Sequence, residues 1–191
     1  MNDAKWLPGF RPDPPVDPET RVRTTERDML NMLGQRYSVV SQGVSVRYAY
    51  AEHVRSAAGF DATRTADFIA MDLWPGKGLH LHGHEVKVSR SDWLVELRDP
   101  SKAEEFKRYM DRWWLVISDR DMVKPGELPD GWGLMAPGKR VARPGERTHG
   151  CLQVIRPAPL LTPDPLPRTM LAALMRATQK TAHREAARLA S

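Results

Sequence analysis

Hydrophobic and polar positions along the chain follow two periods, which together predict an α/β protein. Residues 24–37, TTERDMLNMLGQRY, carry apolar side chains at helical spacing, so we expect a helix capped by Thr24 or Thr25. Rough alternation of β-branched and aromatic residues predicts strands at 48–55 and 66–74. A third strand over 80–89, HLHGHEVKVS, follows the Pro-Gly-Lys-Gly turn at 75–78 and completes a hairpin.

The middle of the chain predicts a crossover between parallel strands. Ser91 and Ser101 are expected to cap a short helix over 92–97 and a second helix over 102–112. The apolar run WWLVIS at 113–118 is typical of a buried strand, and intervening helices make it parallel to the strand before them. Further strands are predicted at 131–135, on the edge of the sheet, and at 151–155. The expected fold is therefore a mixed β-sheet flanked by helices.

Two proline-rich segments divide the chain. Residues 1–20 predict an extended arm, because proline fixes φ and removes a hydrogen-bond donor. Residues 21–156 are expected to form the core domain, and residues 157–167, with five prolines, a linker. Residues 168–191 predict a C-terminal helix, on which Lys180, Arg184 and Arg188 form a face that we expect to be solvated.

Composition and charge narrow the function classes only slightly. The net charge of +5 and pI near 9.6 are compatible with a polyanionic partner such as DNA. A single cysteine, Cys151, excludes an intramolecular disulfide and a cysteine-built zinc site. The N-terminus has no apolar segment typical of a secretory signal, and no apolar run approaches the ~18 residues of a membrane span. We expect a cytoplasmic protein that does not enter a membrane.

The chain contains three acid-x-lysine triplets, and only one of them lies on a predicted strand. In that triplet Glu85 and Lys87 share one face, because alternate residues of a strand point to the same side. The other two triplets lie in the proline-rich arm and on a predicted helix, where positions i and i+2 diverge: Asp3-Ala4-Lys5 and Glu105-Phe106-Lys107. The strand triplet is therefore the candidate for chemistry.

A second carboxylate lies beside this triplet in the predicted hairpin. Asp67 opens the preceding strand, so it and Glu85 would lie on adjacent strands. Two carboxylates placed in this way are typical ligands of Mg²⁺ or Mn²⁺. Such a cation polarises a phosphodiester and lowers the pKa of a bound water. Lys87 would orient or deprotonate that water, or neutralise charge that develops on the phosphate.

This constellation resembles the PD-(D/E)XK nuclease superfamily, and most closely the MmcB-type DNA repair proteins and related phage and bacterial nucleases. The resemblance covers residues 24–135 and rests on four motifs: Arg64-Thr-Ala-Asp67, Glu85-Val-Lys-Val-Ser89, Asp92-Trp93 and Tyr109-x-Asp111-Arg-Trp-Trp. It implies a restriction-endonuclease-like core in which an aspartate opens one strand, Glu-x-Lys lies on the next, and a helix and a further strand follow. The chain has Ala66 where the pattern has proline.

The resemblance also implies roles for individual residues. Asp67 and Glu85 would bind the metal, Lys87 would be catalytic, and the backbone carbonyl of Val86 would be a further metal ligand. A helix-borne acid is also expected. Glu26 matches it best, since it lies in phase with the apolar face of the first helix, and Glu52 on the first strand is the alternative.

Several residues near the triplet are candidates for contact with DNA, through phosphates or by stacking on a base. They are Arg64, Ser89, Arg90, Trp93, Lys102 and Arg112. Trp93 is equally consistent with a core anchor. His80, His82 and His84 alternate on the face opposite to Glu85, and we interpret them as exposed hairpin residues rather than zinc ligands.

The sequence therefore predicts a Mg²⁺- or Mn²⁺-dependent deoxyribonuclease that acts in DNA repair, recombination or phage DNA processing. The expected partner is DNA, and a homodimer is one expected state because many nucleases of this fold pair to cut two strands. A non-catalytic nucleic-acid-binding module on the same fold is the first alternative. A structural protein that binds its partner through the proline-rich arm and the C-terminal helix is the second.

Overall fold

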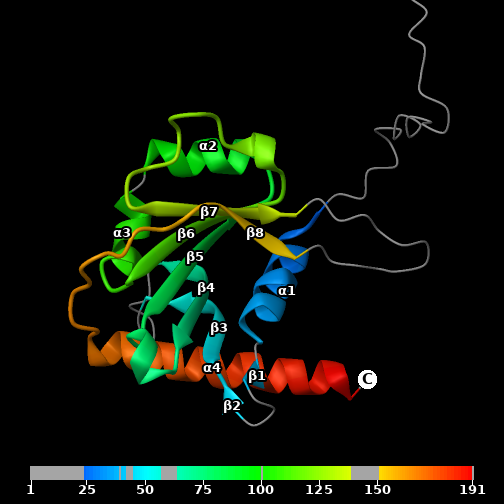
Figure 1. The fold of residues 1–191 in the computed structure, drawn as a ribbon, viewed down its shortest axis with the longest axis vertical. Coiled ribbons are helices and arrows are strands. Elements are labelled where there is room, and N and C mark those ends of the chain that lie inside the picture. Colours follow the sequence, from blue (N-terminus) through cyan, green and yellow to red (C-terminus); the bar gives the residue numbers. More distant parts are fainter. Residues whose placement is uncertain are drawn as a thin grey trace, which may run out of the picture.

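A six-stranded mixed sheet forms the centre of the computed structural model (Figure 1), which describes residues 24–38, 40–41, 45–56, 64–99, 101–138 and 151–190. The strand order is β3-β4-β5-β6-β7-β8. The strands are β3 (Tyr48–Arg55), β4 (Thr65–Asp72), β5 (Leu81–Lys87), β6 (Arg112–Ile117), β7 (Trp132–Pro137) and β8 (Leu152–Arg156). A separate pair consists of β1 (Val40–Ser41) and β2 (Ser45–Val46). The predicted arm at 1–20 lies outside the described residues.

Helices flank this sheet on both faces and along one side (Figure 1). They are α1 (Glu26–Tyr37), α2 (Arg90–Arg98), α3 (Ser101–Lys107) and α4 (Arg168–Leu189), with short 3₁₀ turns η2 (Pro75–Lys77) and η3 (Arg120–Met122). Thr25 caps α1 through a capping box with Asp28, which confirms one of the two predicted caps, Thr24 or Thr25. The cap of α2 is Ser89 rather than the predicted Ser91, because α2 begins two residues earlier than expected. Within the described ranges, no helix is both long and apolar enough to cross a bilayer.

The pairing directions confirm the predicted hairpin and crossover. Strands β3, β4 and β5 form an antiparallel meander, and β6 runs parallel to β5 after the helices α2 and α3. Strand β7 is parallel to β6 and antiparallel to β8. The prediction of 131–135 as an edge strand was wrong, since β7 is paired on both sides. Its run of buried residues, from Trp132 to Ala136, is typical of an interior strand.

Alternation along the strands divides the core into two halves. On one face Trp113, Leu115 and Ile117 of β6 pack with side chains of α2 and α3. On the other face Trp114 and Val116 of the same strand pack with α1. The Trp113 ring on β6 lies over the neighbouring strand at Gly83, where a Cβ atom would be 2.3 Å from the ring, so this position requires glycine.

The hairpin histidines are less exposed than predicted. His84 is fully buried in the core under α1, and His82 is partly buried. The Tyr37 hydroxyl lies 2.9 Å from Nε2 of His84, and the Phe68 carbonyl lies 3.3 Å from its Nδ1. The expectation of exposed histidines was wrong for His84 because the even-numbered side chains of β5 face α1.

Helix α4 covers the outer edge of β3, as Figure 1 shows. The Glu52 backbone N–H donates to Oγ1 of Thr181 at 3.1 Å, which satisfies one donor of an edge strand. Arg188 donates to the Asn31 side chain on α1 at 2.9 Å, and Arg184 donates to the Glu52 carboxylate. Lys180, Arg184 and Arg188 are exposed, as the sequence predicts, and Arg184 and Arg188 also attach the helix to the core.

Burial of His84 predicts a loss of stability in acid. Burial holds the pKa of His84 well below its ordinary value, so the folded chain resists a proton that the unfolded chain accepts near pH 6.5. The stabilising contribution is complete above about pH 6.5 and is lost as the pH falls below that value. Urea denaturation of wild type and His84→Gln at pH 7 and pH 5 measures this.

The stability advantage of wild type over His84→Gln should shrink from pH 7 to pH 5. His183→Gln, which changes an exposed histidine of α4, is the control. An advantage that is the same at both pH values would contradict the prediction.

Candidate active site

Three side chains from three neighbouring strands lie in one row across the sheet. The register that pairs Phe68 with His84 places Asp67 opposite Glu85 at the next position. In the same way, the register between β3 and β4 places His53 opposite Asp67. The row lies at the end of the meander where β4 begins and β5 ends. The antiparallel register thus joins positions that are 14 and 18 residues apart in the chain (67 − 53 and 85 − 67).

Asp67 is held by the backbone of the neighbouring strand. Its Oδ2 accepts a hydrogen bond from the Val86 N–H at 2.8 Å, just beyond the last backbone pair between β4 and β5. The contact of Val86 with the site is therefore its N–H, and a role for its carbonyl stays a prediction. Burial raises the pKa of the Asp67 carboxyl, and burial together with the charge of Asp67 raises the pKa of Glu85. A cation near these two acids would stabilise their ionised forms.

Lys87 supplies one such cation and connects two carboxylates. Its Nζ donates to Glu85 Oε1 and lies 3.3 Å from Oε2 of Glu96. Burial alone would lower the pKa of Lys87, but the charges of Glu85, Glu96 and Asp67 outweigh burial and raise the pKa to about 12. Lys87 is therefore an ammonium group at neutral pH in this arrangement. Glu96 reaches it from α2, where it lies on the same buried face as Trp93.

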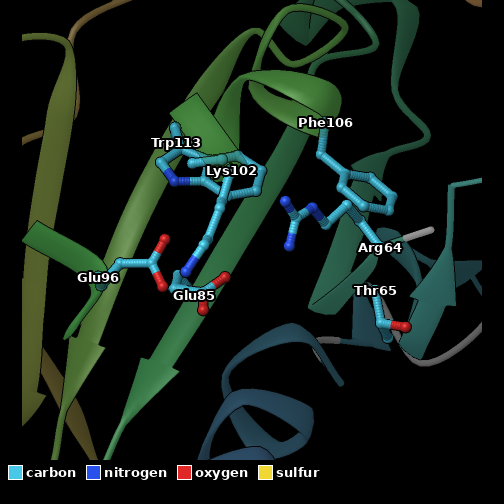
Figure 2. Close-up of a pocket in the computed structure, with 8 residues that line it drawn as sticks. Arg64, Thr65, Glu85, Glu96, Lys102, Phe106 and Trp113 are labelled. Carbon is cyan, nitrogen blue, oxygen red and sulfur yellow. The ribbon is translucent and has the colours of Figure 1, made fainter. Parts of the chain in front are cut away.

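A pocket of about 270 Å³ opens beside these carboxylates (Figure 2). Figure 2 shows the Lys102 amine and the Arg64 guanidinium pointing into it, toward Glu85 and Glu96. Arg64 also lies 3.9 Å from Glu105 on α3. The remaining lining comes from Thr65, Ala103, Phe106 and Trp113. A pocket with both acids and cations can hold a metal ion together with a phosphate group.

Glu26, His53 and Asp67 form a second group on the other side of Asp67. One ligand atom from each of them lies within 4.8 Å of the other two. Glu26 lies in the first turn of α1, and its Oε1 is 3.9 Å from Nδ1 of His53. His53 has a φ of 50°, in the left-handed region, which is rare for a histidine within a strand. Of the two predicted acids for completing the site, Glu26 is the one that meets Asp67.

Glu52 has a different environment. Its side chain is 4% exposed, and its Oε2 accepts from Nη1 of Arg27 at 2.6 Å and from Arg184. Glu52 pairs with Phe68 across the strands, whereas the neighbouring position of β4 holds Asp67, so the two acids lie on alternate faces. Glu52 therefore lies apart from Asp67 and neutralises two arginines, and its role as the completing acid stays a prediction.

The predicted DNA-contact residues separate into two groups. Arg64 and Lys102 line the pocket. Ser89 instead caps α2, Arg90 is paired with Glu127, and Arg112 donates to the Ala158 carbonyl. Stacking of Trp93 on a base was wrong, because the side chain is 0% exposed and its ring lies 6.3 Å from that of Trp132 in the core.

Sequence reasoning missed two residues of the site, His53 and Glu96. The position of His53 follows only from the register of β3 and β4, which the alternation of residues does not give. Glu96 had a detectable signal, because it lies three residues after Trp93, on the buried face of α2. An acid in that position needs a buried partner, which is Lys87.

Comparisons with known proteins do not assign this site. No protein-family model matches the chain, and no curated protein matches it. Among solved structures, the chain is similar to a protein of unknown function from Silicibacter pomeroyi, with a TM-score of 0.47 and 19% sequence identity. The match covers 76% of this chain and 81% of that one.

Glu52 is buried and paired with arginines, whereas Glu26 is half-exposed beside Asp67, so substitutions of the two should affect different properties. Glu52→Gln should lower the free energy of unfolding by about 1–3 kcal/mol, because it weakens two charge-assisted hydrogen bonds to a buried carboxylate. Glu26→Gln should change stability by less than about 0.5 kcal/mol, because the side chain is about half exposed.

Glu26→Gln should lose more metal affinity than Glu52→Gln, although it loses less stability. Urea denaturation and calorimetric titration with Mn²⁺ measure the two quantities. A greater loss of Mn²⁺ binding in Glu52→Gln than in Glu26→Gln would contradict the assignment.

Proposed function

We propose that this chain is a metal-dependent nuclease that hydrolyses phosphodiester bonds of DNA. The observation that carries the proposal is the placement of Asp67, Glu85 and Lys87 at one end of the meander, beside a pocket with two further cations. This set combines ligands for a divalent cation with positive groups for a phosphate.

The order of the helices and strands, and the directions in which the strands pair, support the same proposal. Helix α1 is followed by the antiparallel strands β3, β4 and β5, and the helices α2 and α3 lead to the parallel strand β6. Asp67 lies near the start of β4, and the Glu-x-Lys triplet ends β5. The PD-(D/E)XK resemblance of the sequence implies this order, with a restriction-endonuclease-like core as the fold.

The residues present fit a divalent cation. Asp67 and Glu85 offer carboxylate oxygens from adjacent strands, and their burial disfavours two uncompensated negative charges. Mg²⁺ or Mn²⁺ held there would polarise the phosphodiester and lower the pKa of the attacking water. Asp67 is oriented for this role by the Val86 N–H.

Lys87 acts as a fixed positive charge in the proposed reaction. The carboxylates of Glu85 and Glu96 hold its ammonium group at the end of β5, where it stabilises negative charge that develops on the phosphate. Arg64 and Lys102 bind phosphates of the strand that enters the pocket. The chain thus supplies metal ligands, an electrostatic stabiliser and a phosphate-binding surface from separate elements.

Asp67→Asn, Glu85→Gln and Lys87→Met should each lower the cleavage rate by about a thousandfold, because each removes a metal ligand or the positive charge at the phosphate. The assay uses labelled single-stranded, linear duplex, nicked, flapped and branched DNA with Mg²⁺ or Mn²⁺. Lys107→Met is the matched control, since Lys107 belongs to the acid-x-lysine triplet on α3 and pairs with Glu104.

Cleavage that survives all three substitutions would refute the proposal. Wild-type protein that binds these DNAs but cleaves none of them with either ion would favour the non-catalytic binding module instead.

Lys102→Ala should weaken DNA binding without changing the fold. The loss of one phosphate contact should lower the slope of log affinity against log salt by about 0.9 for duplex DNA. Binding of labelled DNA in a chelator, which prevents cleavage, measures that slope. Lys77→Ala is the control, because Lys77 lies on the exposed turn η2 at the opposite end of the hairpin. Equal slopes for the two variants would contradict a role for Lys102.

A further inference from the structure

We propose that Glu26, His53 and Asp67 form a mixed oxygen- and nitrogen-ligand site that selects a transition-metal dication, represented by Mn²⁺, over Mg²⁺. The three side chains come from α1, β3 and β4, and one ligand atom of each lies within 4.8 Å of the others. The inference concerns metal binding: it shares Asp67 with the ligand pair of the proposed nuclease and Glu26 with the acids predicted to complete that site, and it adds His53 as a ligand.

The geometry of the group requires only a small adjustment around a cation. Ligand atoms on one ion lie up to about 4.4 Å apart, twice a bond of about 2.2 Å. The side chains of Glu26 and His53 are 51% and 42% exposed, so they can move by the few tenths of an ångström that remain. Asp67 is fixed by the Val86 N–H and provides the rigid member of the set.

The charges around the group also favour a cation. Glu26 and Asp67 contribute two carboxylates, and within the described part of the chain neither forms an ion pair with a lysine or arginine. Glu85, in contrast, already has Lys87 as its ion-pair partner. The charge of Lys87 also acts on Asp67, but within the described residues the two carboxylates beside His53 have no direct ion pair with a lysine, such as Glu85 has. A bound dication would compensate the charge of these two carboxylates.

The imidazole determines which ion the group prefers. Mg²⁺ binds oxygen ligands and keeps several waters, whereas imidazole nitrogen suits transition metals. A set of two carboxylates and one histidine therefore favours Mn²⁺ and its heavier neighbours over Mg²⁺. Replacing the imidazole by a third carboxylate should remove this preference.

The backbone conformation at His53 allows a test that separates metal binding from folding. A φ of 50° costs an L-residue roughly 1–2 kcal/mol, and glycine avoids that cost. His53→Gly therefore removes the imidazole without adding backbone strain. A variant that keeps or gains thermal stability while it loses metal affinity would assign the histidine to binding rather than to folding.

The experiment is calorimetric titration of the full chain with Mn²⁺ and, separately, Mg²⁺. Wild type should bind Mn²⁺ at least about tenfold more tightly than Mg²⁺, and His53→Gly should weaken Mn²⁺ binding by about tenfold or more. His53→Asp should bring the two affinities within about threefold of each other. His183→Ala, on the exposed face of α4, is the control and should behave as wild type.

Pulsed electron paramagnetic resonance of bound Mn²⁺ gives a second readout that does not depend on activity. Wild type and His183→Ala should show nitrogen coupling from a directly bound imidazole, and His53→Gly should lack it. Equal affinities of wild type for Mn²⁺ and Mg²⁺, or nitrogen coupling that persists in His53→Gly, would overturn the inference.

These outcomes are distinguishable from failure of the proposed nuclease. Mn²⁺ binding that depends on His53, together with no cleavage of any DNA, would support this site and refute the nuclease. Cleavage that depends on Glu85, together with no ion preference and no effect of His53→Gly on metal affinity, would refute this site alone.

Discussion

The register of the antiparallel strands β3, β4 and β5 is the constraint on which the site depends. A shift of one residue between β4 and β5 would turn Glu85 and Lys87 toward the core under α1 and turn His84 and Val86 toward the face covered by α2 and α3. The core therefore specifies the site indirectly: burial of the even-numbered side chains of β5 fixes the direction of the odd-numbered ones. Substitutions in the core under α1 can disturb the chemistry without contacting it.

The arrangement on which the proposed chemistry depends opposes the stability of the fold. Asp67, Glu85 and Glu96 place three carboxylates around one ammonium group, and burial raises the pKa of Asp67 and of Glu85. The left-handed backbone at His53 adds strain in the same row. Compensation comes from elsewhere in the fold, above all from the two apolar cores and from the ion pairs between Glu52 and two arginines.

The sequence contained enough information for the hairpin, the parallel crossover and the pairing of Asp67 with Glu85, because alternation and turn signals are local. The sequence did not reveal which residues lie beside β3 in the folded chain. His53 enters the row only through the pairing of two strands, and Glu96 only through the packing of α2 on the sheet. The interior position of β7 and the docking of α4 likewise depend on contacts between distant segments.

The position of α4 has a consequence for how copies of this chain meet. An uncovered edge strand offers unpaired N–H and C=O groups on which a second chain can add its own strand. Because α4 occupies that edge of β3, extension of the sheet from one copy to the next is blocked on the side where the row of His53, Asp67 and Glu85 begins. The other outer strand of the described sheet is β8, and its residues from Gln153 to Arg156 are exposed. A sheet continued through β8 would place the two rows of His53, Asp67 and Glu85 far apart, on opposite flanks of the assembly.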